Sequence, residues 1–62
     1  MTQTTEAIML TVGDQIREGF AGPFVTIIER ESFSRGCRIW IRLENGNEHT
    51  LTAATTLVIN RK

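Results

Sequence analysis

The stretch that most constrains the fold is Arg38–Leu43, in which basic or aromatic residues alternate strictly with aliphatic ones before the turn sequence Glu44-Asn45-Gly46. Alternation with a period of two is typical of a half-buried β-strand, and Asn-Gly after such a run is a strong hairpin signal. The chain is therefore expected to form a β-hairpin whose first strand has two different faces. One face carries Ile39, Ile41 and Leu43, and the other carries Arg38, Trp40 and Arg42.

The register of this hairpin can be predicted from how well it separates polar from apolar side chains. A two-residue loop at Asn45-Gly46 mixes them on both faces, whereas a three-residue loop with a left-handed Gly46 separates them better. The second register pairs Arg42 with Glu48, an opposite-charge pair that contributes about 0.2–1 kcal/mol. We therefore expect a three-residue loop with a G1 bulge at Gly46 and with Leu51 directed into the core.

The remainder of the chain is predicted to be extended, with no helical period of ten residues. Residues 1–7 are polar and lack a pairing pattern, so we expect a flexible segment outside a domain that covers 8–62. The loop around Pro23 is expected to tuck Phe20 against the core. Adjacent Ile27 and Ile28 predict either a bulge in the second strand or a strand covered on both faces, and leave open which isoleucine enters the core.

These segments add up to an all-β fold of five short strands. The second strand is expected to end near Glu29, and a polar connection over 30–36 leads to the hairpin. A short 3₁₀ turn over 53–55 is predicted before the last strand, at 56–60. Five such strands predict a small barrel or partly open roll.

Turn glycines and core aliphatic residues recur along most of the chain, at Val12-Gly13-Asp14, Ile16, Gly22, Val25, Ile28, Ile39, Ile41, Leu43, Gly46, Leu51, Leu57 and Ile59. This layout resembles that of the SH3-like small β-barrels, a group that includes KOW and Tudor modules. The resemblance implies an interaction domain more than an enzyme, and no particular partner. The chain has no tyrosine for an aromatic cage and lacks the dense basic residues of RNA-binding KOW modules.

Size and composition exclude several function classes. A chain of 62 residues buries only about 60% of its unfolded surface, which leaves little room for a deep enzyme cleft. One cysteine and one histidine are too few for a structural zinc site. We therefore expect no enzyme activity, no metal and no cofactor. The lone Cys37 indicates a reducing compartment, with a secreted dimer bridged through Cys37 as the alternative. The short apolar runs predict no membrane segment, so a cytoplasmic protein is expected.

The candidate binding residues are Arg38, Trp40, Arg42, Thr50 and Thr52, which the predicted register places on the outer face of the hairpin. Tryptophan and arginine are enriched at the energetic centres of protein interfaces. The leading hypothesis is accordingly a non-catalytic module that binds another protein or itself. Its small size is compatible with a regulator from a phage or mobile element.

Two other interpretations of this face remain open. Trp40 could stack on a nucleobase while Arg38 and Arg42 contact phosphates, although seven basic and seven acidic residues give no net positive charge to attract nucleic acid. Alternatively, the arginine side chains simply shield an exposed tryptophan. His49 is interpreted as structural, Cys37 as a small buried residue, and Asp14 as a turn residue whose side chain bonds the backbone two residues further on.

Overall fold

The computed structural model describes residues 2–17 and 22–61 and confirms an all-β protein. Over these residues it has six strands, one more than the sequence predicted, and one 3₁₀ turn. In chain order, the elements are β1 (Thr2–Glu6), η1 (Ala7–Met9), β2 (Gln15–Arg17), β3 (Phe24–Phe33), β4 (Arg38–Leu43), β5 (Glu48–Thr52) and β6 (Thr56–Asn60).

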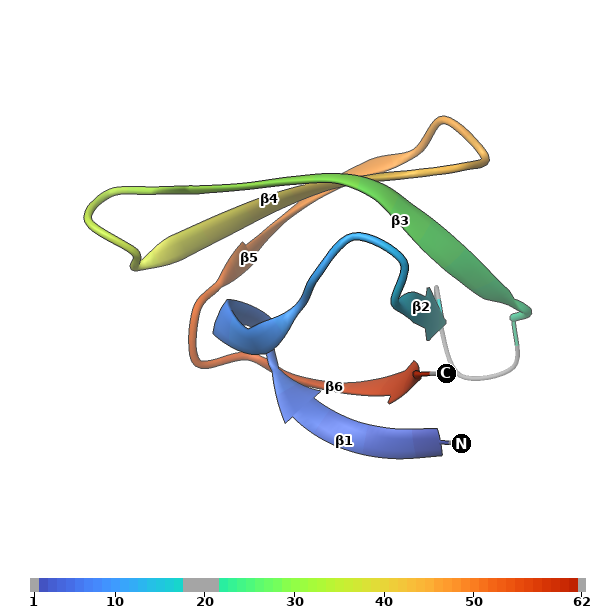
Figure 1. Cartoon of the computed structure of the whole chain (residues 1–62). Helices are drawn as coiled ribbons and strands as arrows, with labels where there is room; N and C mark the ends of the chain where they lie inside the picture. The colour runs from blue at the N-terminus through green and yellow to red at the C-terminus, as the bar shows by residue number, and fades with distance from the viewer. Residues whose placement is uncertain (1, 18–21, 62) are drawn as a thin grey trace.

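The strands form one antiparallel sheet in the order β1-β6-β2-β3-β4-β5. Figure 1 shows that this sheet bends over itself: β3, β4 and β5 lie above, β6 and β1 lie below, and η1 lies between the two halves. The sheet is open, because β1 and β5 are its two edges and are not paired with each other.

A bulge in β3 allows this one strand to serve both halves of the sheet. Its first residues pair with β2, and its later residues pair with β4. The register shifts between Ile27 and Glu29, so Ile28 is the extra residue of a β-bulge, one of the two predicted alternatives. Ile27 has no exposed surface, whereas Ile28 is 46% exposed. The isoleucine that enters the core is therefore Ile27.

The core lies between the two halves of the folded sheet. Fully buried side chains from several strands and from the turn before β2 fill it, with Leu51 and Leu57 packed against them; the largest are Leu10, Ile27, Ile39, Ile41, Leu43 and Ile59. The alternation in β4 is thus satisfied, since every second residue is buried.

The predicted hairpin register is confirmed. Ile39 pairs with Leu51, Ile41 with His49, and Arg42 with Glu48. The Leu43 N–H donates to the Asn47 carbonyl at 2.8 Å, and Gly46 has a φ of 91°, as a G1 bulge requires.

Several sequence-based expectations were wrong. Thr2–Glu6 is not a flexible segment outside the domain, because it pairs along its whole length with β6. The 3₁₀ turn is η1 at Ala7–Met9, whereas residues 53–55 form an ordinary turn before the last strand. Two N–H groups of η1 donate to that turn, from Ala7 to the Thr55 carbonyl and from Ile8 to the Ala53 carbonyl.

β3 also runs four residues beyond the predicted end, through Phe33, and residues 34–37 form the turn into β4. The polar sequence after Glu29 is extended because each of its residues from Arg30 to Phe33 lies opposite a residue of β4. The expected packing of Phe20 falls outside the described residues.

The bulge predicts that alanine substitution of two adjacent isoleucines destabilises the protein to very different extents. Ile27→Ala is expected to lower the free energy of unfolding by about 2–5 kcal/mol, because it leaves a cavity in the core. Ile28→Ala, the matched control, should cost less than about 1 kcal/mol, because that side chain is largely in solvent. Urea unfolding followed by Trp40 fluorescence measures both values. Equal losses would show that the bulge does not separate the two side chains as described.

Candidate functional site

The candidate site is the outer face of β3, β4 and β5, where nine residues form three rows across the strands. Residues directly opposite each other in an antiparallel pair share a face of the sheet. The register therefore defines the rows as Phe33-Arg38-Thr52, Glu31-Trp40-Thr50 and Glu29-Arg42-Glu48. We call these nine residues the outer face. All five residues predicted from the sequence belong to it, and Trp40 occupies its centre.

Arg42 and Trp40 are held in place by acidic neighbours on the two flanking strands. Arg42 Nη1 lies 3.2 Å from Glu29 Oε1, and Arg42 Nη2 lies 3.9 Å from Glu48 Oε2. The Trp40 indole N–H donates to Glu48 Oε1 at 3.1 Å. The Arg42 guanidinium also lies over the Trp40 ring, 5.3 Å from its centroid, in reach of a cation–π interaction. These contacts hold Trp40 in a half-buried position.

The remaining charges on this face lie on either side of Trp40. Glu31 is directly opposite Trp40, and Arg38 precedes Trp40 by two residues on β4. Both side chains are exposed, and neither has an ion-pair or hydrogen-bond partner among residues 2–17 and 22–61. The outer face thus carries three carboxylates and two guanidinium groups, and its unpaired charges are one of each sign.

Apolar surface surrounds these charges. Phe33 is 44% exposed on the outer face, in the row next to Trp40. Ile28 is exposed at the bulge, beside Glu29. The outer face therefore carries an indole ring and a phenyl ring. Its Arg42 is already neutralised by the carboxylates of Glu29 and Glu48.

Sequence reasoning missed Glu29, Glu31 and Phe33 as members of this face. It placed Glu29 at the end of the second strand and assigned Glu31 and Phe33 to a polar connection. Their alternation, Glu29 and Glu31 followed by Phe33, has the strand period and was the available signal. Arg30, between them, lies on the inner side, where its Nη2 donates to the Ile8 carbonyl at 2.9 Å.

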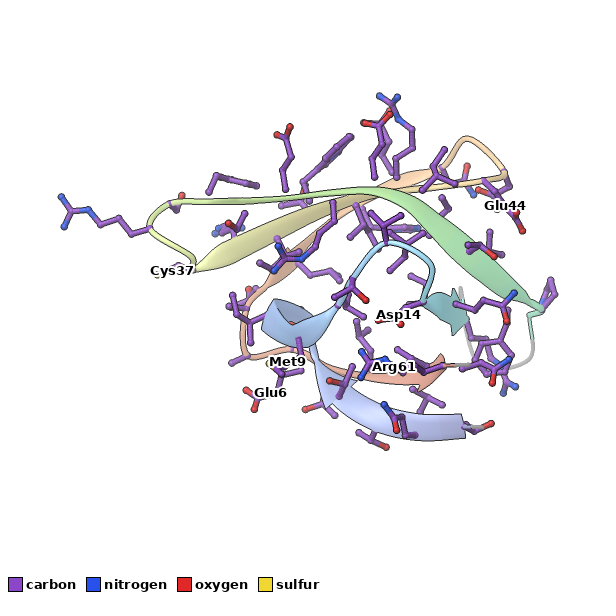
Figure 2. All side chains as sticks on the ribbon, viewed as in Figure 1. Glu6, Met9, Asp14, Cys37, Glu44 and Arg61 are labelled. Atoms are coloured by element: carbon purple, nitrogen blue, oxygen red, sulfur yellow. The ribbon has the colours of Figure 1, made fainter. Side chains whose placement is uncertain are left out.

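The other sequence candidates do not join this face. Cys37 is exposed in the turn before β4, and Figure 2 labels it at that end of the strand. The expectation of a buried cysteine was therefore wrong. Cys37 belongs to the turn over residues 34–37 and not to β4, so it does not share the alternating burial of the aliphatic residues of β4. His49 is half-buried opposite Ile41, on the side of the sheet that faces the core.

A second polar cluster joins the turn before β2 to the residue after β6 (Figure 2). Asp14 is only 4% exposed and accepts hydrogen bonds from Arg61, with Nε at 3.0 Å from Oδ1 and Nη2 at 2.8 Å from Oδ2. The Thr11 N–H also donates to Oδ2 at 3.0 Å. The sequence predicted a bond to the backbone two residues further on, whereas the backbone contact is with Thr11, before Asp14 in the chain. The sequence-based prediction also missed Arg61, which lies 47 positions away.

The partners of Asp14 determine its ionisation. Hydrogen bonds from the Arg61 guanidinium lower the pKa of Asp14, burial opposes this effect, and the Thr11 N–H adds to the lowering. Arg61 also donates to the Met9 carbonyl at 3.3 Å. Hydrogen bonds within the chain thus use the acceptor capacity of the Asp14 carboxylate, so this cluster is best explained as a structural link. We call Thr11, Asp14 and Arg61 the clasp, because they join the turn before β2 to the residue after β6.

Within the described part of the chain, no group of three histidine, cysteine or acidic side chains is arranged to hold a metal ion. None of its helical segments has the length and apolar character needed to cross a membrane. No protein-family model, curated protein or solved structure gives a significant match to this chain.

The clasp predicts a pH dependence of stability. Because folding lowers the pKa of Asp14 below its unfolded value of about 3.9, its contribution is present above that pH and is lost as the pH falls through the folded pKa. Asp14→Asn should therefore reduce the free energy of unfolding by about 1–3 kcal/mol at neutral pH. The difference from the unsubstituted protein should shrink in acid.

Urea unfolding at a series of pH values, followed by Trp40 emission, measures this difference. Arg61→Gln is the matched control: it removes the main cause of the lowered pKa and should flatten the pH dependence while Asp14 stays ionisable. A difference between the unsubstituted protein and Asp14→Asn that stays constant into the acid range would contradict the assignment.

Proposed function

We propose that this chain is a small non-catalytic module that binds a protein partner through the outer face. The observation that carries the proposal is the pre-positioned Trp40, which is half-buried, donates its indole N–H to Glu48 and lies one row from Phe33. A rigid aromatic side chain costs little conformational entropy on binding, and tryptophan is the residue type most enriched at interface hot spots.

The charges of the face support a polypeptide rather than a polyanion as the partner. Nucleic-acid sites depend on cations that neutralise phosphates. Here Arg42 is paired with Glu29 and Glu48, and Glu31 lies directly opposite Trp40. A phosphate backbone would meet these three carboxylates. A polypeptide segment with an apolar side chain for Trp40 and a basic side chain for Glu31 would match both features.

The same proposal includes the SH3-like layout as the hypothesis for the fold family. The turn glycines and core aliphatic residues support it, whereas the six-stranded sheet of the described residues is open and not closed into a barrel. Small β-domains of this kind carry many functions, so the layout alone assigns no partner. The single cysteine remains the basis for placing the protein in a reducing compartment such as the cytoplasm.

Selection from a displayed library of random peptides tests the proposal. Peptides selected on the intact protein should combine an aromatic or branched aliphatic residue with a basic one. Their Kd, measured by titration calorimetry, should rise at least about tenfold for Trp40→Ala, as expected for an interface hot spot. Glu31→Gln should weaken the same peptides by a smaller factor, since its charge is exposed.

Val58→Ser is the matched control, because Val58 is also a large exposed apolar residue, at 47%, but lies on β6. It should leave the affinity unchanged. Peptides that lose affinity for Val58→Ser and keep it for Trp40→Ala would place the binding surface elsewhere. Salt-reversible quenching of Trp40 by single-stranded DNA or RNA would instead support the nucleic-acid alternative.

A further inference from the structure

The strand β5 leaves one edge of the sheet open, with backbone groups directed outward. In an antiparallel pair, residues whose backbones bond each other alternate with residues whose backbones point away. The bonds from Leu43 to Asn47 and from Ala53 to Cys37 show that the odd-numbered residues of β5 face β4. The N–H and C=O groups of Glu48 and Thr50, and the N–H of Thr52, therefore face outward.

Within residues 2–17 and 22–61, these outward groups have no backbone partner. The backbone N–H groups of Ala7 and Ile8 in η1 donate to the segment just beyond β5, at Thr55 and Ala53, and not to β5 itself. Exposed edge strands invite pairing with another chain, and proteins that stay monomeric commonly block them with lysine, proline or a bulge. The sequence of β5, Glu-His-Thr-Leu-Thr, contains no lysine or proline, and its pairing with β4 is regular.

We propose that β5 pairs antiparallel with β5 of a second copy of this chain, about a two-fold axis at Thr50. In this register Thr50 lies opposite its own counterpart, and Glu48 lies opposite Thr52 of the second copy. The six strands of the two β3-β4-β5 units then form one continuous surface. This inference goes beyond the proposed function, because it uses the backbone edge of β5 rather than the side chains around Trp40.

Charge complementarity selects this register and this edge. Thr52 of the second copy lies beside its own Arg38 on the outer face. Glu48 and that Arg38 are then two strand spacings apart, about 10 Å between Cα atoms, a separation that two long side chains can bridge. A two-fold axis at Glu48 instead of Thr50 would place Glu48 opposite Glu48 of the second copy, which is unfavourable.

The other edge, β1, lacks this complementarity. The same two-fold pairing of β1 at Thr4 would place Glu6 opposite Thr2 of the second copy. The neighbour of Thr2 on β6 is Asn60, which carries no charge. Because the Ala7 N–H bonds to Thr55, the even-numbered residues of β1 face outward, as Thr50 does on β5. Thr4 is therefore a matched control position.

Proline substitution at these two threonines tests the proposal by sedimentation equilibrium of the full chain. Proline removes an N–H that points outward in either strand, so the internal ladder is kept. The unsubstituted protein and Thr4→Pro should form dimers, and Thr50→Pro should be monomeric. Circular dichroism and Trp40 emission establish that each variant is folded. A monomeric unsubstituted protein at millimolar concentration would overturn the proposal.

Disulfide trapping gives a second test that does not depend on the proline variants folding. In the proposed register the two Thr50 Cα atoms are about 5.5 Å apart, within the range that a disulfide spans. With Cys37→Ser as background and oxidised glutathione as oxidant, Thr50→Cys should yield a covalent dimer and Thr4→Cys should not. Cross-linking of Thr4→Cys alone would assign the contact to β1.

The remaining outcomes separate this inference from the proposed function. Loss of dimers in both proline variants would indicate head-to-tail pairing of β1 with β5 and would reject the two-fold contact. Dimers that dissociate in Trp40→Ala but persist in Thr50→Pro would show that the outer face, and not the β5 edge, joins the copies. Dimers that persist in Trp40→Ala while its peptide affinity falls support both proposals independently.

Discussion

The fold depends on a single irregularity in β3, the extra residue Ile28. A strand of ten residues with uninterrupted register would hold its partners in one gently twisted sheet, whereas a bulge bends the strand and increases its local twist. Here β3 pairs with β2 over residues 24–26 and with β4 from Ile27 onward, so the bend at Ile28 lies just after the change of partner. The two halves of the sheet can then close on a common core, which a chain of this length could not build from two separate sheets.

The bulge also determines which side chains reach the outer face. Because the register shifts by one residue, Glu29 and Glu31 lie on the solvent side of β3 and Arg30 lies on the inner side. Without the shift the acidic residues would point inward, where two carboxylates would be costly. The environment of Trp40 is thus a consequence of the same irregularity that shapes the core, since Glu29 anchors Arg42 and Arg42 lies over the indole.

The sequence predicted local features well and long-range ones poorly. The register of the 38–52 hairpin followed from the side-chain period and turn chemistry. Two adjacent isoleucines indicated either a bulge or a strand covered on both faces, and the structure has the bulge. Thr2–Glu6 carries no apolar period of its own and becomes a strand only because β6 offers it a partner. The clasp between Asp14 and Arg61 joins residues far apart in the chain, and no local pattern encodes such a pair. The part of the site on β4 and β5 was predicted because it follows from the register of this hairpin. The part on β3 was missed because the pairing of polar residues with a neighbouring strand is a tertiary property.

The pairing of β1 with β6 has a mechanical consequence. Thr2 lies opposite Asn60, so the first and last strands begin and end at the same side of the molecule, as Figure 1 shows. A force that pulls Thr2 and Asn60 apart acts perpendicular to β1 and β6. It would break the hydrogen bonds between these two strands one pair after another. The hairpin of β4 and β5 lies outside this line of force. Under tension, β1 would therefore peel away first while the surface around Trp40 kept its shape.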